Sequence, residues 1–385
     1  MISIEGAQAR PPLPSGPTQL YFIAIGSQDY AYADRAFDHP FERVFAPEHS
    51  AKRVAEQLLR AGATYGILLT SDADGKPGIG RVSREDIYRA LFDLKARIRK
   101  DQASNPRILF YFMGHGLGDA PTKFGYLIPG NLVFERMASQ TYVFRLLRYA
   151  VPDFDVIAAL ATFRLAAPMA YLDEFAPTQV MPDPSSLADV MKKTARANEL
   201  TQKDEANRVA GRYPVEGTAP VPFIVLFDNC YGGIVADLIG TTEASPIART
   251  LFENMERDMA ETQSDGLVAY ATTPGSAVGD YPDPAYADAD EPPLVGPLAA
   301  RLFEVMNGRH EGEAISLRQF RDRYFAPTSL RSQGSSIDLP RPYSVNSTIS
   351  EVLDAPFFPA FRPASTGFLE TRTGSGEKVL ACCNR

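Results

Sequence analysis

Five short segments of this chain are apolar at nearly every position. They are LYFIAIG (20–26), YGILLT (65–70), RILFYFMG (107–114), PFIVLFDN (222–229) and GLVAYATT (266–273). A strand that is apolar on both faces must be buried on both faces, which is typical of the inner strands of a parallel sheet. The segments therefore predict an α/β fold in which helices cover both sides of a mostly parallel central sheet.

The segments between the first three strands have the periodicity of amphipathic helices. Between about residues 48 and 61, apolar side chains recur at the spacing of one helix face, and Gly62 is suited to end that helix. Ser83 and Asp86 have the spacing of a capping box, and an apolar stripe follows over residues 87–98. Two helices are therefore predicted, one after each of the first two strands.

A chain of 385 residues is long enough for one large domain with additional segments. Residues 1–17, rich in Pro, Gly and Ala, are predicted to be a disordered leader. The main domain is predicted over 18–345, with an insertion at about 131–222 that is longer than a simple crossover connection requires. Residues 346–385 are predicted to be a C-terminal extension, loosely ordered after about residue 364.

Composition limits the compartment and the partners. Lysine and arginine number 39 and aspartate and glutamate 47, so the formal net charge is −8, which argues against a nucleic-acid or anionic-membrane partner. The start of the chain lacks the pattern of a secretory signal, and the best membrane-span candidate (156–172) is interrupted by Arg164 and Pro168. Three cysteines do not make a disulfide framework. A cytoplasmic protein is predicted.

A histidine and a cysteine each follow directly on one of the apolar segments. His115 lies between glycines after the third segment, and Cys230 follows the fourth. Residues at the carboxyl ends of parallel strands meet at one edge of the sheet, so these two side chains are expected to lie close together. A thiolate is a strong nucleophile that a nearby imidazole can activate. Each residue alone also fits a structural histidine or a buried cysteine, but together they predict a Cys–His hydrolase site.

The two motifs resemble those of a known family. YFMGHG (111–116) and FDNCYGG (227–233) are similar to the His-Gly and Asp-x-Cys-x-Gly motifs of the caspase and metacaspase superfamily of cysteine peptidases. The resemblance extends from about residue 18 to about residue 345 and includes GYLIPGN (125–131) and AYATTPG (269–275). It implies a three-layer α-β-α sandwich with a mostly parallel central sheet, and the activity of a cysteine endopeptidase that needs no cofactor.

The resemblance assigns roles to particular residues. His115 is expected to be the catalytic histidine and Cys230 the nucleophile. The main-chain amides of Gly116 and Cys230 are expected to form the oxyanion hole, which agrees with the accessible amides that the neighbouring glycines provide.

Acidic residues suggest which bond is cut. Caspases cleave after Asp and use arginines in the primary pocket, whereas metacaspases cleave after Arg or Lys and use acids. Asp228 occupies an acidic pocket position of the metacaspase motif, Asp280 lies in the loop where caspases carry an arginine, and Asp29 is a weaker third candidate. Because a carboxylate pairs strongly with a guanidinium, a protein or peptide substrate with Arg, then Lys, at P1 is predicted. The alternatives are that Asp228 caps the following helix or braces the cysteine turn, that Asp280 is an exposed loop acid, and that the protease is Asp-specific.

Regulation and cofactors are the remaining expectations. Members of the family are often held as zymogens or controlled by a partner, so an activator or regulatory protein and a role in cell death or defence are expected. Arg249 and Arg257 are candidate self-processing sites, although both also fit the solvated face of an amphipathic helix. The acidic loop after Gly275 lacks the spacing of a recognised calcium site, and no cluster has zinc spacing, so no metal is predicted.

Two other classes of function remain open. The same fold without catalysis would be a scaffold or binding module, and the same dyad could carry out another acyl transfer.

Overall fold

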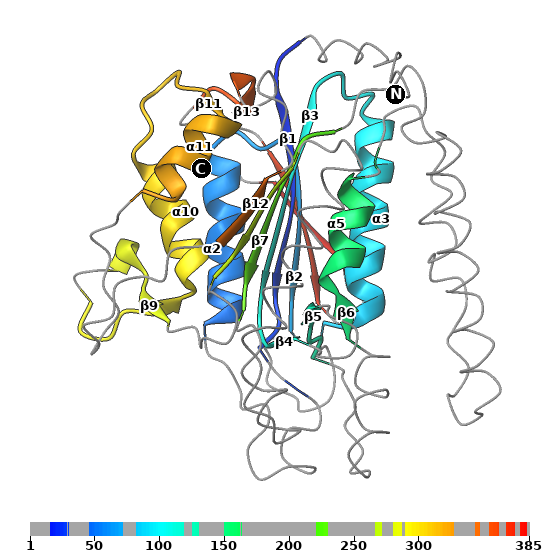
Figure 1. Ribbon diagram of the computed structural model, residues 1–385, viewed down its shortest axis with the longest axis vertical. Helices are drawn as coiled ribbons and strands as arrows, with labels where there is room; N and C mark the ends of the chain where they lie inside the picture. Colours follow the sequence, from blue (N-terminus) through cyan, green and yellow to red (C-terminus); the bar gives the residue numbers. More distant parts are fainter. Residues whose placement is uncertain are drawn as a thin grey trace, which may run out of the picture.

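An eight-stranded sheet forms the centre of the molecule (Figure 1). The computed structural model describes residues 16–28, 30, 46–71, 82–118, 125–130, 150–161, 163, 221–229, 266–271, 280–286, 289–326, 343–346, 354–361, 367–373 and 378–382. The strands of this sheet are β1 (Gln19–Gly26), β2 (Tyr65–Thr70), β3 (Pro106–Met113), β7 (Phe223–Asp228), β8 (Gly266–Tyr270), β12 (Tyr343–Asn346), β14 (Phe368–Thr373) and β15 (Lys378–Cys382). Their order is β12-β8-β7-β3-β1-β2-β14-β15.

The six inner strands are all parallel, and the two edge strands are antiparallel to their neighbours. All five predicted strands lie in this parallel set. Every described residue of β1 after Gln19, and every residue of β2, β3, β7 and β8, is buried. The prediction of an α/β fold with a mostly parallel sheet is confirmed, because strands without a polar face are buried on both sides.

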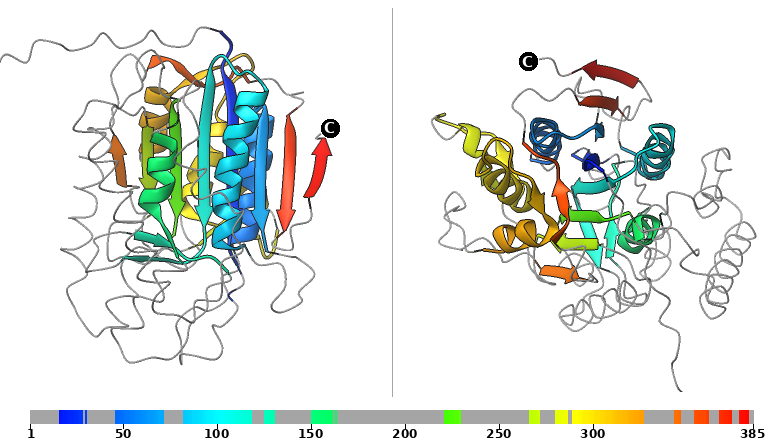
Figure 2. Two further views of the ribbon diagram at one scale, coloured as in Figure 1. Left: turned by 90° about the vertical axis from the view of Figure 1, so that its right-hand side faces the viewer. Right: turned by 90° about the horizontal axis from the view of Figure 1, so that it is seen from above.

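Helices lie on both sides of the sheet, as the view from above shows (Figure 2). The helices α2 (Pro47–Arg60), α10 (Pro297–Asn307) and α11 (Leu317–Tyr324) are on one side. The helices α3 (Arg84–Lys100) and α5 (Asp153–Ala161) are on the other. This arrangement is compatible with a three-layer sandwich. Among the described helices, none combines the length and apolar character needed to cross a bilayer.

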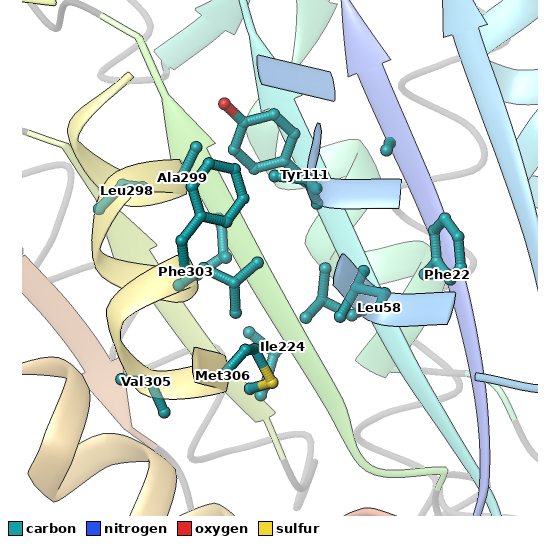
Figure 3. Close-up of a cluster of buried hydrophobic side chains, with 14 of the residues drawn as sticks. Phe22, Leu58, Tyr111, Ile224, Leu298, Ala299, Phe303, Val305 and Met306 are labelled. Carbon is teal, nitrogen blue, oxygen red and sulfur yellow. The ribbon is translucent and has the colours of Figure 1, made fainter. Parts of the chain in front are cut away.

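The core between α10, α2 and the sheet contains large side chains from all three (Figure 3). Phe303 of α10 and Leu58 of α2 lie over the strands, beside Tyr111 of β3 and Ile224 of β7. The opposite faces of the same strands belong to a second apolar cluster, under α3 and α5. The strands therefore contribute alternate side chains to two separate cores.

Both predicted helices are confirmed, together with the end of the first and the start of the second. Helix α2 ends at Arg60, and Gly62 just beyond it has a positive φ of 91°, which suits glycine at that position. Helix α3 starts after Ser83, whose side chain accepts a hydrogen bond from the Asp86 amide while the Asp86 carboxylate accepts one from the Ser83 amide. Local signals thus mark the end of α2 and the start of α3.

Short elements complete the described structure. They are β4 (Gly116–Gly118), β5 (Gly125–Leu127), β6 (Val151–Pro152), β9 (Tyr281–Pro282), a 3-10 turn (Pro284–Tyr286), β10 (Leu294–Val295), β11 (Ile315–Ser316) and β13 (Pro356–Phe358). The strands β4, β5 and β6 form a small antiparallel sheet beyond one end of the main sheet (Figure 1).

Part of the predicted insertion belongs to the core. The structure describes residues 150–161, 163, 221 and 222 of it, and these include β6 and α5. Val156, Ile157 and Leu160 of α5 are buried in the second apolar cluster. Of the predicted leader, residues 1–15 lie outside the described part of the chain.

The C-terminal residues differ from the expected loose tail. Strand β14 pairs with β2, and β15 pairs with β14 at the edge of the sheet (Figure 2). The alternating polar residues of β14 resemble a solvent-facing segment in the sequence, but they are buried and paired. The Glu370 carboxylate accepts hydrogen bonds from the Tyr65 hydroxyl and from Arg372 Nε at 2.7 Å, and Arg372 also pairs with Asp93 of α3 at 2.6 Å.

We expect Arg372→Met to reduce the free energy of unfolding by about 3 to 5 kcal/mol, because it leaves the Glu370 carboxylate without its cation in a buried position. Urea unfolding measures the change. The control is Arg318→Met, which removes a solvent-exposed pair with Asp354 and is expected to leave the unfolding midpoint near that of the wild type. Equal midpoints for the two variants would show that β14 is not part of the cooperative fold.

Candidate functional site

The strand order reverses between β1 and β3, and a binding site is expected at the carboxyl ends of these strands. The chain passes from β1 outward to β2 on one side and to β3, β7 and β8 on the other, so the order reverses between β1 and β3. In open α/β sheets, ligands bind outside the carboxyl ends of the strands at such a reversal. The residues that follow β1 and β3, and the end of the neighbouring β7, are therefore where chemistry is expected.

The structure places His115 at this point. It lies two residues after the end of β3, is half-buried, and Met113, the last residue of β3, is in register with Asp228 at the end of β7. The backbone N–H of His115 donates to the Tyr30 hydroxyl at 2.8 Å, and its carbonyl accepts from the Ile128 amide at 3.0 Å. The centroid of the Tyr30 ring lies 4.8 Å from that of the imidazole, at 48° to it. The histidine is thus held through both its backbone and its ring.

Gly114 is required for this arrangement. A Cβ at position 114 would lie 2.9 Å from the Tyr30 hydroxyl and 3.0 Å from the Ser27 carbonyl oxygen. Such distances are too short for a side chain, so only glycine allows the end of β3 to approach Ser27 and Tyr30 so closely. Close packing against Ser27 and Tyr30 therefore explains why a glycine precedes His115.

Several predicted site residues lie outside the described part of the chain. Cys230 is the residue after Asn229, the last described residue beyond β7, and β7 pairs with β3, the strand that precedes His115. Asp29, Arg249 and Arg257 also lie outside the described residues. Gly116 begins β4, in register with Leu127 of β5, and its role as an oxyanion donor stays a prediction.

Asp228 is buried between β7 and α10. Its Oδ1 accepts a hydrogen bond from the Leu298 amide at 3.1 Å, and its Oδ2 accepts from the Ala299 amide at 3.0 Å and the Tyr111 hydroxyl at 2.9 Å. The two amides belong to the first turn of α10, where unpaired N–H groups and the helix dipole favour a negative charge. Asp228 therefore caps α10, a helix that is far from it in the sequence but in contact with it in the fold. The expectation of a cap was in part right, but the helix is not the one that follows Asp228.

The pKa values of two predicted pocket acids are raised. Burial, and to a smaller extent the charge of Asp280, raise the pKa of Asp228 to about 7 in spite of its three hydrogen bonds. Burial also raises the pKa of Asp280 to about 6. The structure therefore brings these two acids close enough to repel each other, although 52 positions separate them in the sequence (280 − 228). Asp280 is not a fully exposed loop acid.

A cluster on α2, which the sequence reasoning missed, holds the segment that begins at Asp280. Asp283 is fully buried, and its Oδ2 lies 3.0 Å from His49 Nε2 and 2.8 Å from Arg53 Nε. Burial would raise the pKa of Asp283, but the hydrogen bonds from His49, the Ala285 amide and Arg53 outweigh it and lower the pKa to about 2. The i, i+4 spacing of His49 and Arg53 on one helix was the available signal.

A polar row crosses this edge of the sheet on the side of α3 and α5. Ser27 Oγ, Ser71 Oγ and both polar atoms of the Asn229 side chain are buried without a hydrogen-bond partner within the described part of the chain. Each residue lies two positions beyond the last complete apolar row. That row consists of Leu69, Ile25, Phe112, Phe227 and Tyr270. Unpartnered buried polar groups are rare in proteins and are often found at functional sites. The described part of the chain also has such atoms elsewhere, on Asn105 and on four arginine side chains.

The comparisons give no independent family assignment. No protein-family model and no curated protein matches the chain. Over the described ranges, there is also no group of three or more His, Cys, Asp or Glu side chains that could hold a metal ion. The functional argument therefore depends on the residues at the carboxyl edge of the sheet.

We expect Asp228→Asn to change how stability depends on pH. The pKa of Asp228 is raised in the folded state, so its contribution to stability is full below about pH 4 and is lost as pH rises to about 7. The free energy of unfolding of the wild type, minus that of the variant, should fall by up to about 4 kcal/mol over this range and be constant above it.

Urea unfolding at a series of pH values measures this difference, and Asp283→Asn is the control. The pKa of Asp283 is lowered, so its contribution is present above about pH 4 and is lost as pH falls toward 2. A pH-independent difference for Asp228→Asn would show that its carboxyl is not perturbed by burial.

Proposed function

We propose that the chain is a caspase-like or metacaspase-like cysteine endopeptidase that uses His115 and Cys230 and cleaves after Arg, then Lys. The observation that carries the proposal is the position of His115. It is fixed at the strand-order reversal, beside the strand whose chain continues into Cys230. The arrangement of the helices is compatible with the three-layer sandwich of that superfamily.

The chemistry requires only the groups of this chain. In the proposed reaction, the His115 imidazole takes the proton of the Cys230 thiol, and the thiolate attacks the carbonyl carbon of the scissile bond. The amides of Gly116 and Cys230 donate hydrogen bonds to the oxyanion. The imidazolium then gives its proton to the leaving amine, and water hydrolyses the thioester to release the acid and restore the thiol.

The acid pair supports a basic P1 residue. Asp228 and Asp280 are both largely removed from water, and the charge of one disfavours the charge of the other. A guanidinium or ammonium group paired with Asp280 would relieve this repulsion and be attracted by the charge of Asp228 as well, so a cation gains more here than at an ordinary surface acid. Asp29 remains the third candidate for this pocket.

Regulation belongs to the same proposal. The enzyme is held as a zymogen or controlled by a partner protein, in a cell-death or defence response. Self-processing at Arg249 or Arg257 would leave fragments of defined mass after incubation of an active preparation.

A peptide panel that differs only at P1 (Arg, Lys, Asp, Leu) tests the reaction. The wild type should cleave after Arg and Lys, and Cys230→Ala should lose all turnover because no other group can form the thioester. The control is the double variant Cys382→Ala, Cys383→Ala, which removes the two other thiols and should keep wild-type turnover. Cleavage after Asp would contradict the pocket assignment. If the wild type cleaves none of the peptides, with or without calcium and after incubation, the alternative of a non-catalytic scaffold would be favoured.

The pH dependence of P1 selectivity tests the acid pair separately. Peptides with arginine or its neutral analogue citrulline at P1 would be cleaved by the same dyad. The ratio of their kcat/KM values is therefore independent of the titration of the dyad. Only ionised acids attract the guanidinium, so the ratio should rise as pH increases through about 6 to 7. Asp280→Asn should raise KM for the Arg peptide by about tenfold to a hundredfold, with little effect on the citrulline peptide. A ratio that is flat with pH would exclude these acids from the pocket.

A further inference from the structure

The Tyr30 side chain connects the ends of β1 and β3 at the strand-order reversal. It is buried, with 7% of its surface exposed. Its hydroxyl donates a hydrogen bond to the Ser27 carbonyl at 2.8 Å and accepts one from the His115 backbone N–H at 2.8 Å. Its ring packs on the imidazole at a centroid distance of 4.8 Å.

The hydroxyl replaces one bond of the parallel ladder. The last backbone bond between these strands runs from the Ser27 N–H to the Met113 carbonyl at 2.9 Å. In a regular parallel ladder the next bond would run from the His115 N–H to the Ser27 carbonyl. The Tyr30 hydroxyl is hydrogen-bonded to both of these groups. Two hydrogen bonds through its oxygen, a bridge, therefore replace the single direct bond that would pair the strands here.

This bridge sets how far the His115 segment diverges from β1. A direct ladder bond would draw the backbone at His115 toward Ser27, whereas the inserted oxygen keeps them apart and leaves the imidazole against the Tyr30 ring. Gly114 makes the insertion sterically feasible, because a side chain there would meet the hydroxyl. The position and the ring contact of His115 thus depend on one side chain.

We propose that Tyr30 is a positioning residue that fixes the His115 imidazole for catalysis. This rests on the proposed function in taking His115 as the catalytic base. A displacement of about 1 Å at a reacting group can cost about a hundredfold in rate, so loss of the bridge or of the ring contact should reduce kcat. Because Tyr30 is buried, we expect KM to change little.

The test compares Tyr30→Phe and Tyr30→Leu in the full chain with variants of Tyr21. Tyr21 lies at the other end of β1, is also buried, and donates to Asp101 at 3.2 Å, so Tyr21→Phe and Tyr21→Leu are matched controls. We expect Tyr30→Phe to lower kcat about tenfold and Tyr30→Leu up to about a hundredfold, both with KM within about threefold of the wild type. The Tyr21 variants should lower the unfolding midpoint but keep kcat. Equal effects of Tyr30→Leu and Tyr21→Leu on kcat would overturn the proposal.

A second readout does not require peptidase activity. The imidazole signals of His115, identified in NMR spectra of histidine-labelled protein by their loss in His115→Gln, should shift in Tyr30→Leu and stay in place in Tyr21→Leu. If they shift while the wild type cleaves no peptide, the positioning role stands and the proposed function fails. If peptides are cleaved but neither kcat nor the signals respond to Tyr30→Leu, the positioning role is overturned and the proposed function stands.

Discussion

The central sheet can exist only if both of its faces are covered. Five of its inner strands, β1, β2, β3, β7 and β8, have no polar face, so α2 and α10 must exclude water on one side and α3 and α5 on the other. In these five strands, polar side chains are best placed where the strands end. The imidazole of His115, the carboxylate of Asp228 and the hydroxyl of Tyr30 all lie at that edge, and the position of the candidate site follows from the burial of the sheet.

At that edge, the Asp228 carboxylate interacts with both α10 and Asp280. Asp228 caps the first turn of α10 and lies close to Asp280 at the start of the segment that leads to the same helix. Burial makes its charge unfavourable, while the helix amides favour it. In the proposed pocket, a cationic P1 side chain would favour that charge as well.

Local signals predicted most of the fold. Five inner strands and the ends of α2 and α3 were evident from continuous apolar runs, helix periodicity and one capping box. His115 was found because it directly follows a strand. The partners of Asp228 and the ladder position of Tyr30 could not be found, since they depend on strand register. Strand β14 was missed because its polar residues are satisfied by Tyr65 and Asp93, far away in the sequence. The roles of Cys230 and Asp29 stay predictions.

The late position of β14 has a consequence for how the chain folds during its synthesis. Tyr65 of β2 is in register with Phe368 of β14, which is 303 positions later (368 − 65). At roughly 5 to 20 residues per second, a ribosome needs roughly 15 to 60 seconds to make that interval. During this time one edge of β2 has no native neighbour, and an unpaired apolar strand can pair with another nascent chain. The fold therefore depends on a segment that leaves the ribosome long after the strand with which it pairs.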